Sequence, residues 1–215
     1  MRHDRALQLM DGYKTLIKSV CAEYTLKRSR FLCYAKPIAN EQSATAFIKE
    51  IAARHWDASH NVWAYALREG QRTRYSDDGE PQGTAGLPVL EALRSRRITD
   101  AVLVVTRYYG GVRLGASGLI RAYAHSAGLG IEESGVAEMQ PCVRLKLSLP
   151  YARFKQLEHI LAQLGGVFVD TVFAENVTAI FDLSQEAQEQ FLALLMEFVS
   201  GTQAETLGLG YFRSN

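Results

Sequence analysis

The chain has 215 residues, of which 47% are hydrophobic and 22% charged, and its formal net charge is +1. This composition is typical of a folded globular domain with a sizeable core. The near-zero charge excludes a protein that binds polyanions through its overall charge, and it also excludes an acidic tail protein. Because no run of 18 apolar residues occurs, the sequence predicts no membrane span.

Charge is distributed unevenly along the chain. Residues 1–137 contain 19 Lys and Arg against 14 Asp and Glu, a net +5, whereas residues 138–215 contain 5 against 9, a net −4. Opposite signs favour two units with different surfaces, and a mildly basic first unit suits phosphate groups. Chance partition of solvated charges is the alternative.

The cysteines indicate a reducing, cytoplasmic setting. Cys21, Cys33 and Cys142 are odd in number, and no Cys-x-x-Cys pair occurs. Neither a disulfide framework nor a zinc site is therefore predicted. All three are expected to be small core residues.

Taken in chain order, the first half alternates strands and helices. Apolar periodicity and turn residues predict two strands within 19–38 around the basic turn Lys27–Arg30, a helix over 41–55 capped by Asn40, a strand over 61–69, a helix over 87–96, a strand over 100–109 and a helix over 119–134. Gly128 and Gly130 weaken the helical pattern in the last of these segments.

The second half of the chain predicts a different order of strands and helices. It predicts a strand over 142–150, a helix over 151–165, a hairpin with strands in 166–174 and 176–184, a helix over 185–201 and a strand over 204–212. The order β-α-β-β-α-β is that of a ferredoxin-like domain. We place the domain boundary near residue 138.

A glycine-rich stretch, "YYGGVRLGASG", lies between a predicted strand and a predicted helix. Its glycines are Gly110, Gly111, Gly115 and Gly118. A helix N-terminus entered through glycines favours the close approach of an anion, and Arg107 and Arg113 add positive charge. The stretch matches neither dinucleotide nor P-loop fingerprints. A tight turn packed against a neighbour explains it equally well.

A second loop, "YSDDGEPQGTAG" over 75–86, is rich in acids. Asp77, Asp78 and Glu80 are candidate ligands for Mg²⁺ or Ca²⁺, or acceptors for arginines such as Arg74 and Arg107. Thr84 precedes the helix over 87–96 and is a candidate cap. A third reading is a binding surface shared with the glycine-rich stretch.

Other chemistry-bearing residues carry weaker signals. His60 stands beside no nucleophile motif, so a structural role is favoured over catalysis. Trp56 and Trp63 are expected in the core rather than as stacking platforms. Tyr108 and Tyr109 suit either base stacking or one buried and one exposed ring.

Three segments resemble the YigZ/IMPACT family: "KRSRF" (Lys27–Phe31), "YSDDGEPQGTAGLPVL" (Tyr75–Leu90) and "VVTRYYGGVRLGASGLIRAYAHSA" (Val104–Ala127). The resemblance extends from about residue 18 to the C-terminus. It implies an α+β fold, with an N-terminal domain similar to domain 2 of ribosomal protein S5 (1–137) and a ferredoxin-like C-terminal domain similar to one of elongation factor G (138–215). Eukaryotic relatives regulate translation by competing for a protein that activates a kinase. Those relatives also contain an RWD domain, which this sequence lacks.

Together these observations predict a translation-linked binding protein without catalytic residues, metal or cofactor. Its partner is RNA, the ribosome or a translation factor, with no membrane and no small-molecule ligand assigned. The predicted binding patch joins the two loops and consists of Tyr75, Asp77, Asp78, Glu80, Gly83, Thr84, Arg107, Tyr108, Tyr109, Gly110, Gly111, Arg113, Gly115, Ser117 and Gly118. Lys27, Arg28 and Arg30 are candidate phosphate contacts. Valine at Gly111 or Gly115 is expected to damage the patch.

Two other functions stay open from the sequence. The first is a phosphate-binding enzyme similar to GHMP-type kinases, which share the S5-like fold; Ser117 would contact phosphate, and Asp77 or Asp78 would hold Mg²⁺. The second is a protein-interaction adaptor that docks a partner on the acidic C-terminal sheet.

Overall fold

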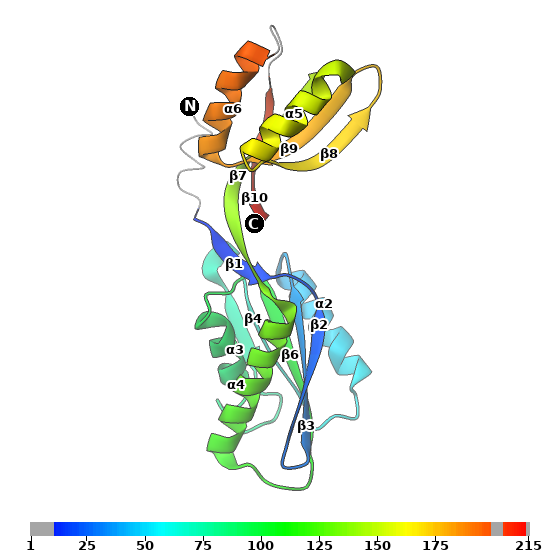
Figure 1. The fold of residues 1–215 in the computed structure, drawn as a ribbon. Coiled ribbons are helices and arrows are strands. Elements are labelled where there is room, and N and C mark those ends of the chain that lie inside the picture. The colour runs from blue at the N-terminus through cyan, green and yellow to red at the C-terminus, as the bar shows by residue number, and fades with distance from the viewer. Residues whose placement is uncertain (1–10, 199–203, 214–215) are drawn as a thin grey trace. The chain divides into compact units, whose positions relative to one another are not determined.

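A computed structural model of the chain describes residues 11–198 and 204–213, with the side chains of residues 196–198 left out (Figure 1). Contacts divide the chain into two units, Tyr13–Glu138 and a second formed by Met1–Gly12 with Met139–Asn215. Each unit is described by itself. The last three residues of the helix predicted over 185–201 lie outside the described residues.

A five-stranded antiparallel sheet forms the centre of the first unit. Its strands are β2 (Val20–Leu26), β3 (Ser29–Pro37), β6 (Ala101–Tyr108), β4 (His60–Ala66) and β5 (Thr73–Ser76), in this spatial order. The remaining elements are β1 (Tyr13–Leu16), α2 (Glu41–Arg54), the 3₁₀ turn η1 (Glu69–Gln71), α3 (Gly86–Arg94) and α4 (Gly115–Ser134).

Both faces of this sheet are covered. Side chains alternate along the central strand β6, so Leu103 enters the core cluster that contains Leu90 of α3. Val104 enters the opposite cluster with Phe47 of α2. Figure 1 shows α3 and α4 on one face and α2 on the other. The strong apolar run predicted as a central strand is therefore buried on both sides.

The predicted helix cap and basic turn are confirmed. Asn40 and Ser43 form a capping box at the start of α2. The turn between β2 and β3 consists of Lys27 and Arg28, whose φ angles of 46° and 68° lie in the left-handed region. This tight hairpin leaves both basic side chains exposed at its tip.

Helix α4 begins at Gly115 and is therefore longer than predicted at its start, and it continues through Gly128 and Gly130 to Ser134. Gly130 faces β3, where a Cβ would collide with Sγ of the buried Cys33. The glycine that weakened the helical prediction is thus required by helix-to-sheet packing. Burial raises the pKa of the Cys33 thiol to about 12.

The second unit shows the predicted β-α-β-β-α-β order. Its elements are β7 (Val136–Leu149), α5 (Tyr151–Gln163), β8 (Val167–Phe173), β9 (Val177–Leu183), α6 (Gln185–Phe198) and β10 (Glu205–Arg213). The antiparallel strands lie in the order β10-β7-β9-β8. Leu157 of α5 and Phe191 of α6 pack with Phe181 in one core cluster.

Strand β7 starts six residues before the predicted strand, so it includes Pro141 and runs across the boundary between the units. Pro141 lies opposite Tyr211 of β10, but pairing with β9 begins only at Val143, so the β9 side of the strand is open at the proline. Cys142 is buried as expected, whereas Cys21 is exposed, which corrects its assignment to the core. Among the described helices, none is long and apolar enough to cross a membrane.

Replacing Gly130 with alanine is expected to destabilise the protein by about 1–3 kcal/mol, because the new methyl group overpacks the contact with Cys33. In the double variant Gly130→Ala/Cys33→Ala the sulfur is gone, so much of this loss should be recovered. Urea unfolding of both variants and of Cys33→Ala measures the coupling. Additive effects of the two substitutions would contradict the packing argument.

Candidate functional site

The acidic loop between β5 and α3 is held by its own first carboxylate. Asp77 accepts hydrogen bonds from the backbone N–H groups of Gly83, Ala85 and Gly86, at 2.9, 3.1 and 2.8 Å. Asp77 therefore stabilises the start of α3, where backbone donors lack partners within the helix. The assignment of Thr84 as the cap is wrong, because its hydroxyl donates to the carbonyl of Pro81 at 2.6 Å.

The second acid fastens the loop to the neighbouring strand. The Asp78 carboxylate accepts from the backbone N–H of Asn61, and the Asp78 carbonyl accepts from Nδ1 of His60 at 2.7 Å. His60 therefore has the structural role favoured from the sequence. Tyr75 is 44% exposed, and a Cβ at Gly86 would collide with the Ser76 backbone and with the Tyr75 ring.

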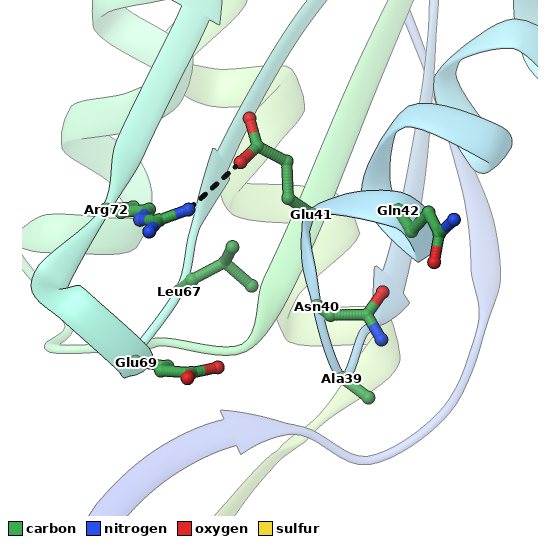
Figure 2. A pocket seen from close by; sticks show the side chains of 7 residues that line it. All are labelled: Ala39, Asn40, Glu41, Gln42, Leu67, Glu69 and Arg72. Atoms are coloured by element: carbon green, nitrogen blue, oxygen red, sulfur yellow. Dashed lines mark hydrogen bonds and ion pairs between the residues drawn. The ribbon is translucent and has the colours of Figure 1, made fainter.

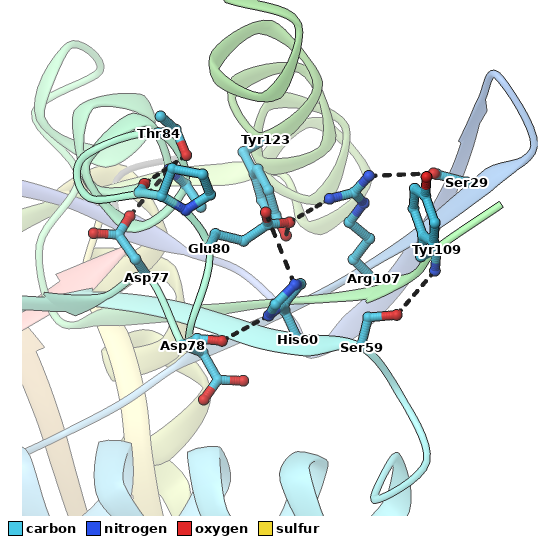
Figure 3. A network of polar contacts seen from close by, with 12 residues as sticks. Ser29, Ser59, His60, Asp77, Asp78, Glu80, Thr84, Arg107, Tyr109 and Tyr123 are labelled. Atoms are coloured by element: carbon cyan, nitrogen blue, oxygen red, sulfur yellow. Dashed lines mark hydrogen bonds and ion pairs between the residues drawn. The ribbon is translucent and has the colours of Figure 1, made fainter. Parts of the chain in front are cut away.

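Glu80, the third acid, is buried beneath the loop in an ion pair with Arg107 of β6 (Figure 3). Its Oε1 lies 2.6 Å from Nη1 of Arg107 and accepts from the hydroxyl of Tyr123 at 2.7 Å. Its Oε2 lies 3.9 Å from Nε2 of His60. Burial, followed by the Glu80 charge, raises the pKa of Tyr123.

The Arg107 side chain is buried rather than exposed on the surface. Its side chain is 6% exposed, and its guanidinium carbon lies 5.5 Å from the ring of Phe31 and 5.4 Å from that of Tyr109. Nη2 reaches Ser29 Oγ at 3.4 Å, and Nε is without a hydrogen-bond partner within the described residues. This burial corrects the view of Arg107 as a surface contact for phosphate.

The three acids thus contribute to the structure of the loop. Of the two arginines expected to bond them, Arg107 does so, whereas Arg74 lies 3.3 Å from Glu41. Over residues 11–198 and 204–213, no group of three His, Cys, Asp or Glu side chains is arranged to hold a metal ion.

The glycine-rich loop between β6 and α4 packs against the tip of the β2–β3 hairpin. A Cβ at Gly110 would collide with the backbone of Arg28, and the Gly110 N–H donates to Ser29 Oγ at 3.2 Å. Gly110 therefore needs clearance. Gly111 and Gly115 have open space around them but φ angles of 82° and 70°, so valine would be strained there by its backbone conformation.

The same loop leads into an exposed helix start. Leu114 is the N-cap of α4, with no capping side chain among the described residues, and Gly115, Ala116 and Ser117 are exposed. The first N–H groups of a 20-residue helix therefore face outward with its positive dipole end. Gly118 is buried.

The residues predicted for the binding patch and for phosphate contacts differ in how far they are exposed to solvent. Glu80, Thr84, Arg107 and Gly118 are buried and support the loops from within. The hairpin tip and the glycine-rich loop form what is here called the tip patch, which consists of Lys27, Arg28, Tyr109, Gly110, Gly111, Arg113, Gly115 and Ser117; all of these are exposed except Gly110, which is half-buried. The other predicted residues lie outside the tip patch: Tyr75 and Asp78 are exposed, and Asp77, Gly83 and Tyr108 are half-buried. Arg30 is exposed too, but it forms a two-point ion pair with Glu23 at 2.7 and 3.0 Å.

Sequence reasoning missed a polar network at the end of α2. Nε2 of His55 lies 2.6 Å from the Tyr34 hydroxyl, and Nδ1 lies 2.9 Å from that of Tyr108. Tyr108 donates to Asp57 at 3.1 Å, so Nδ1 donates to Tyr108 and Nε2 accepts from Tyr34. Tyr34, His55, Asp57 and Tyr108 are called the His55 network below.

The environment of His55 disfavours its charged form. Burial, followed by the positive charge of Arg54, lowers the pKa of His55, while Asp57 acts in the opposite direction. The strands that carry Tyr34 and Tyr108 pair in a register that brings both rings to the α2 face. This register was the missing signal, because the sequence places the two tyrosines 74 positions apart.

Next to this network, Trp56 is 84% exposed, which corrects its assignment to the core. Trp63 is only partly exposed and stacks on Tyr65, with ring centroids 5.9 Å apart. The two tryptophans therefore have opposite environments, although their sequence contexts suggested the same one.

A pocket of about 310 Å³ lies elsewhere, between the start of α2 and η1 (Figure 2). One of its two carboxylates, that of Glu41, accepts from the Tyr65 hydroxyl at 2.7 Å and lies 3.4 Å from Arg72. The Tyr65 hydrogen bond is the main reason why the pKa of Glu41 is lowered. None of the residues predicted for the binding patch lines this pocket, so we do not assign it as the site.

Fold and site together define a mixed α/β protein whose exposed basic loops are supported by a buried ion pair. In the described part of the chain it has five α-helices and two sheets. The Impact N-terminal domain model matches residues 27–131, and the model called domain of unknown function DUF1949 matches residues 147–202. The chain therefore belongs to the IMPACT family.

Relatives cover most of the chain. IMPACT family member YvyE of Bacillus subtilis is 35% identical over 194 residues, which are 90% of this chain and 89% of the relative. IMPACT family member YigZ of Escherichia coli is 31% identical over 82% of this chain and 88% of the relative. A crystal structure titled as a hypothetical protein is 28% identical and covers 93% of this chain and 98% of its own, with a TM-score of 0.60.

Truncating Glu80 to alanine should destabilise the protein by about 3–5 kcal/mol, because Arg107 would stay buried without its counter-ion. Replacing both partners, as in Glu80→Leu/Arg107→Leu, removes the uncompensated charge and should recover part of this loss. Tyr123→Phe, which removes one hydrogen bond, should cost only about 1 kcal/mol. Denaturant unfolding measures all three. A Glu80→Ala variant as stable as Tyr123→Phe would contradict the buried-pair argument.

The lowered pKa of His55 has a consequence for stability at acid pH. Below its ordinary pKa of 6.5 the histidine binds a proton more readily in the unfolded chain than in the folded one. Stability should therefore fall as pH decreases from about 7.5 to about 5.5, and less so in His55→Gln. His159→Gln, an exposed histidine of α5, is the matched control. Equal pH slopes for wild type and His55→Gln would rule this out.

Proposed function

We propose that the tip patch binds the phosphate backbone of RNA as part of a translation-linked regulatory role. Membership of the IMPACT family supports a translation-related regulatory role at the level of the family. The observation that carries the RNA proposal is the packing of Gly110 on Arg28. This contact joins the basic hairpin tip and the glycine loop, two segments far apart in the sequence, into one surface.

The chemistry of this surface favours an anion. Lys27, Arg28 and Arg113 are exposed on the two joined segments. The start of α4 adds outward-facing N–H groups, and the glycines allow a ligand to approach the backbone closely. Several weak phosphate contacts of this kind give affinity without sequence specificity.

Further proposals concern the fold of each unit and the location of the protein. We assign the first unit as an S5 domain 2-like domain and the second as a ferredoxin-like domain with a boundary near residue 138. The strand order β10-β7-β9-β8, with α5 and α6 packed in the same core, supports the second assignment. We also propose a cytoplasmic location, which the expectation of a reducing setting supports.

The structure bears differently on the two alternative functions, a kinase-like enzyme and a protein-interaction adaptor. For a kinase-like enzyme, Asp77 or Asp78 would have to bind Mg²⁺, but both carboxylates accept backbone hydrogen bonds. For an adaptor, one observation is favourable: Val169, Val172 and Phe173 are 45%, 52% and 59% exposed on β8, the last strand of its sheet. Apolar side chains on an edge strand are suited to strand pairing with a partner.

Fluorescence anisotropy with a labelled single-stranded oligoribonucleotide tests the RNA proposal. Wild type should bind saturably, and affinity should fall as salt rises from about 50 to 200 mM. The variant Lys27→Ala/Arg28→Ala/Arg113→Ala should bind more weakly, with a salt slope reduced by about 2, because each lost phosphate contact removes about 0.7 from the slope for single strands.

The matched control removes three exposed lysines outside the tip patch, in Lys18→Ala/Lys49→Ala/Lys155→Ala. It has the same net charge as the test variant and should keep the wild-type salt slope. Equal weakening in both triple variants would mean that overall charge, rather than this surface, governs binding. Absence of saturable binding at low salt would reject the proposal.

A further inference from the structure

We infer that Trp56 is a stacking platform for an unpaired base of single-stranded RNA. The inference rests on the proposed function and extends it from the phosphates to the bases. Trp56 is 84% exposed, the highest exposure of any large hydrophobic residue described. A tryptophan side chain offers about 150–250 Å² of mostly apolar surface, so leaving it in water forgoes several kcal/mol of burial at about 25 cal/mol per Å².

The turn that carries Trp56 is firmly held. The carbonyl of His55 accepts from Asn61 Nδ2 at 3.2 Å and from the N–H of Ala58 at 3.1 Å. On the other side of Trp56, Asp57 accepts from Tyr108. Residues on both sides of the exposed ring therefore belong to the His55 network, so the turn is positioned in advance and little ordering is needed on binding.

The same turn adjoins the tip patch through direct backbone contacts. The N–H of Ser59 donates to the carbonyl of Arg107 at 2.9 Å, and Ser59 Oγ accepts from the N–H of Tyr109 at 3.1 Å. The ring of Tyr109 is 48% exposed. Only two residues of chain thus separate Trp56 from Ser59, the residue bonded to the glycine loop, so one strand of RNA can reach both.

Two arginines lie over aromatic rings of the His55 network, close to this turn. The guanidinium carbon of Arg54 lies 5.7 Å from the ring centroid of Tyr34, and that of Arg30 lies 6.0 Å from that of Tyr108. Each arginine is in an ion pair, Arg54 with Glu50 and Arg30 with Glu23, and the exposed Asp57 of the turn accepts a hydrogen bond from Tyr108. Exposed aromatic rings flanked by cations are the means by which proteins bind single strands without reading sequence.

Single-stranded rather than double-stranded RNA is required by the chemistry. A base in a duplex is already stacked and paired on both sides, whereas an unpaired base presents a free face to an aromatic ring. Stacking on Trp56 would add affinity that inorganic polyphosphate, with the same charge and no bases, lacks.

The experiment uses the full chain with Trp63→Phe, so that Trp56 is the one remaining tryptophan of the two in the sequence. Its emission is followed during titration with an oligouridylate and, separately, with polyphosphate of similar charge. We expect quenching with RNA and none with polyphosphate. Trp56→Ala should weaken RNA binding by about 5- to 150-fold, from about 1–3 kcal/mol per stacked base, and leave polyphosphate binding and the salt slope unchanged.

Two variants serve as controls. Trp56→Phe keeps an aromatic face and should retain part of the affinity, and Phe173→Ala removes an exposed aromatic ring from the other unit and should bind as wild type does. Because Trp56 is exposed, its substitution should leave thermal unfolding unchanged, so a loss of binding would not arise from misfolding.

The outcomes separate the two proposals. RNA binding that is equal in wild type and Trp56→Ala but weakened by the tip-patch variant would overturn the stacking inference and leave the proposed function standing. Absence of binding to both RNA and polyphosphate would overturn both. Binding to intact ribosomes that depends on Trp56, with free RNA binding that does not, would overturn stacking and assign Trp56 to a protein contact.

Discussion

The buried ion pair between Glu80 and Arg107 is the constraint on which the rest of the first unit depends. It joins the acidic loop to the central strand β6, and through Tyr123 it also joins that loop to α4. Removing two charges from water is costly, so such a pair is tolerated only when its partners are held closely and further hydrogen bonds satisfy them. Here the hydroxyls of Tyr123 and Ser29 supply such bonds, while Nε of Arg107 has no hydrogen-bond partner within the described residues. The loops above the pair are therefore held in place by electrostatics as well as by packing.

This arrangement explains why a loop rich in acids lies in a unit with net positive charge. Asp77 stabilises the start of α3, Asp78 is bonded to β4, and Glu80 neutralises Arg107. Each of these carboxylates thus has a partner within the fold, while the cations of the hairpin tip and the glycine loop stay exposed. Binding potential thus depends on which charges are internally compensated rather than on the sum of charges along the chain.

The His55 network provides a second, independent support at the same end of the unit. It connects the end of α2 to β3 and β6, and it fixes the turn from which Trp56 projects. The buried pair and the network together hold neighbouring loops, one basic and rich in glycine, the other with an exposed tryptophan. A binding surface assembled from loops on a sheet with helices on both faces combines a rigid base with variable chemistry at its edge.

The sequence by itself determined the elements, because apolar periodicity, caps and turn residues act over a few neighbouring positions. The Asn40 cap, the hairpin turn at Lys27 and the β-α-β-β-α-β order of the second unit were all predictable in this way. The motifs that resemble the IMPACT family also marked the acidic loop and the glycine-rich loop. Only the tertiary structure decided which side chains face water. Arg107 is buried because Glu80 lies beside it, Gly130 is required because Cys33 lies opposite, and Trp56 is exposed because its turn is bonded at the sheet end. These outcomes depend on strand register and on contacts between residues far apart in the sequence. Local sequence patterns reveal neither of them.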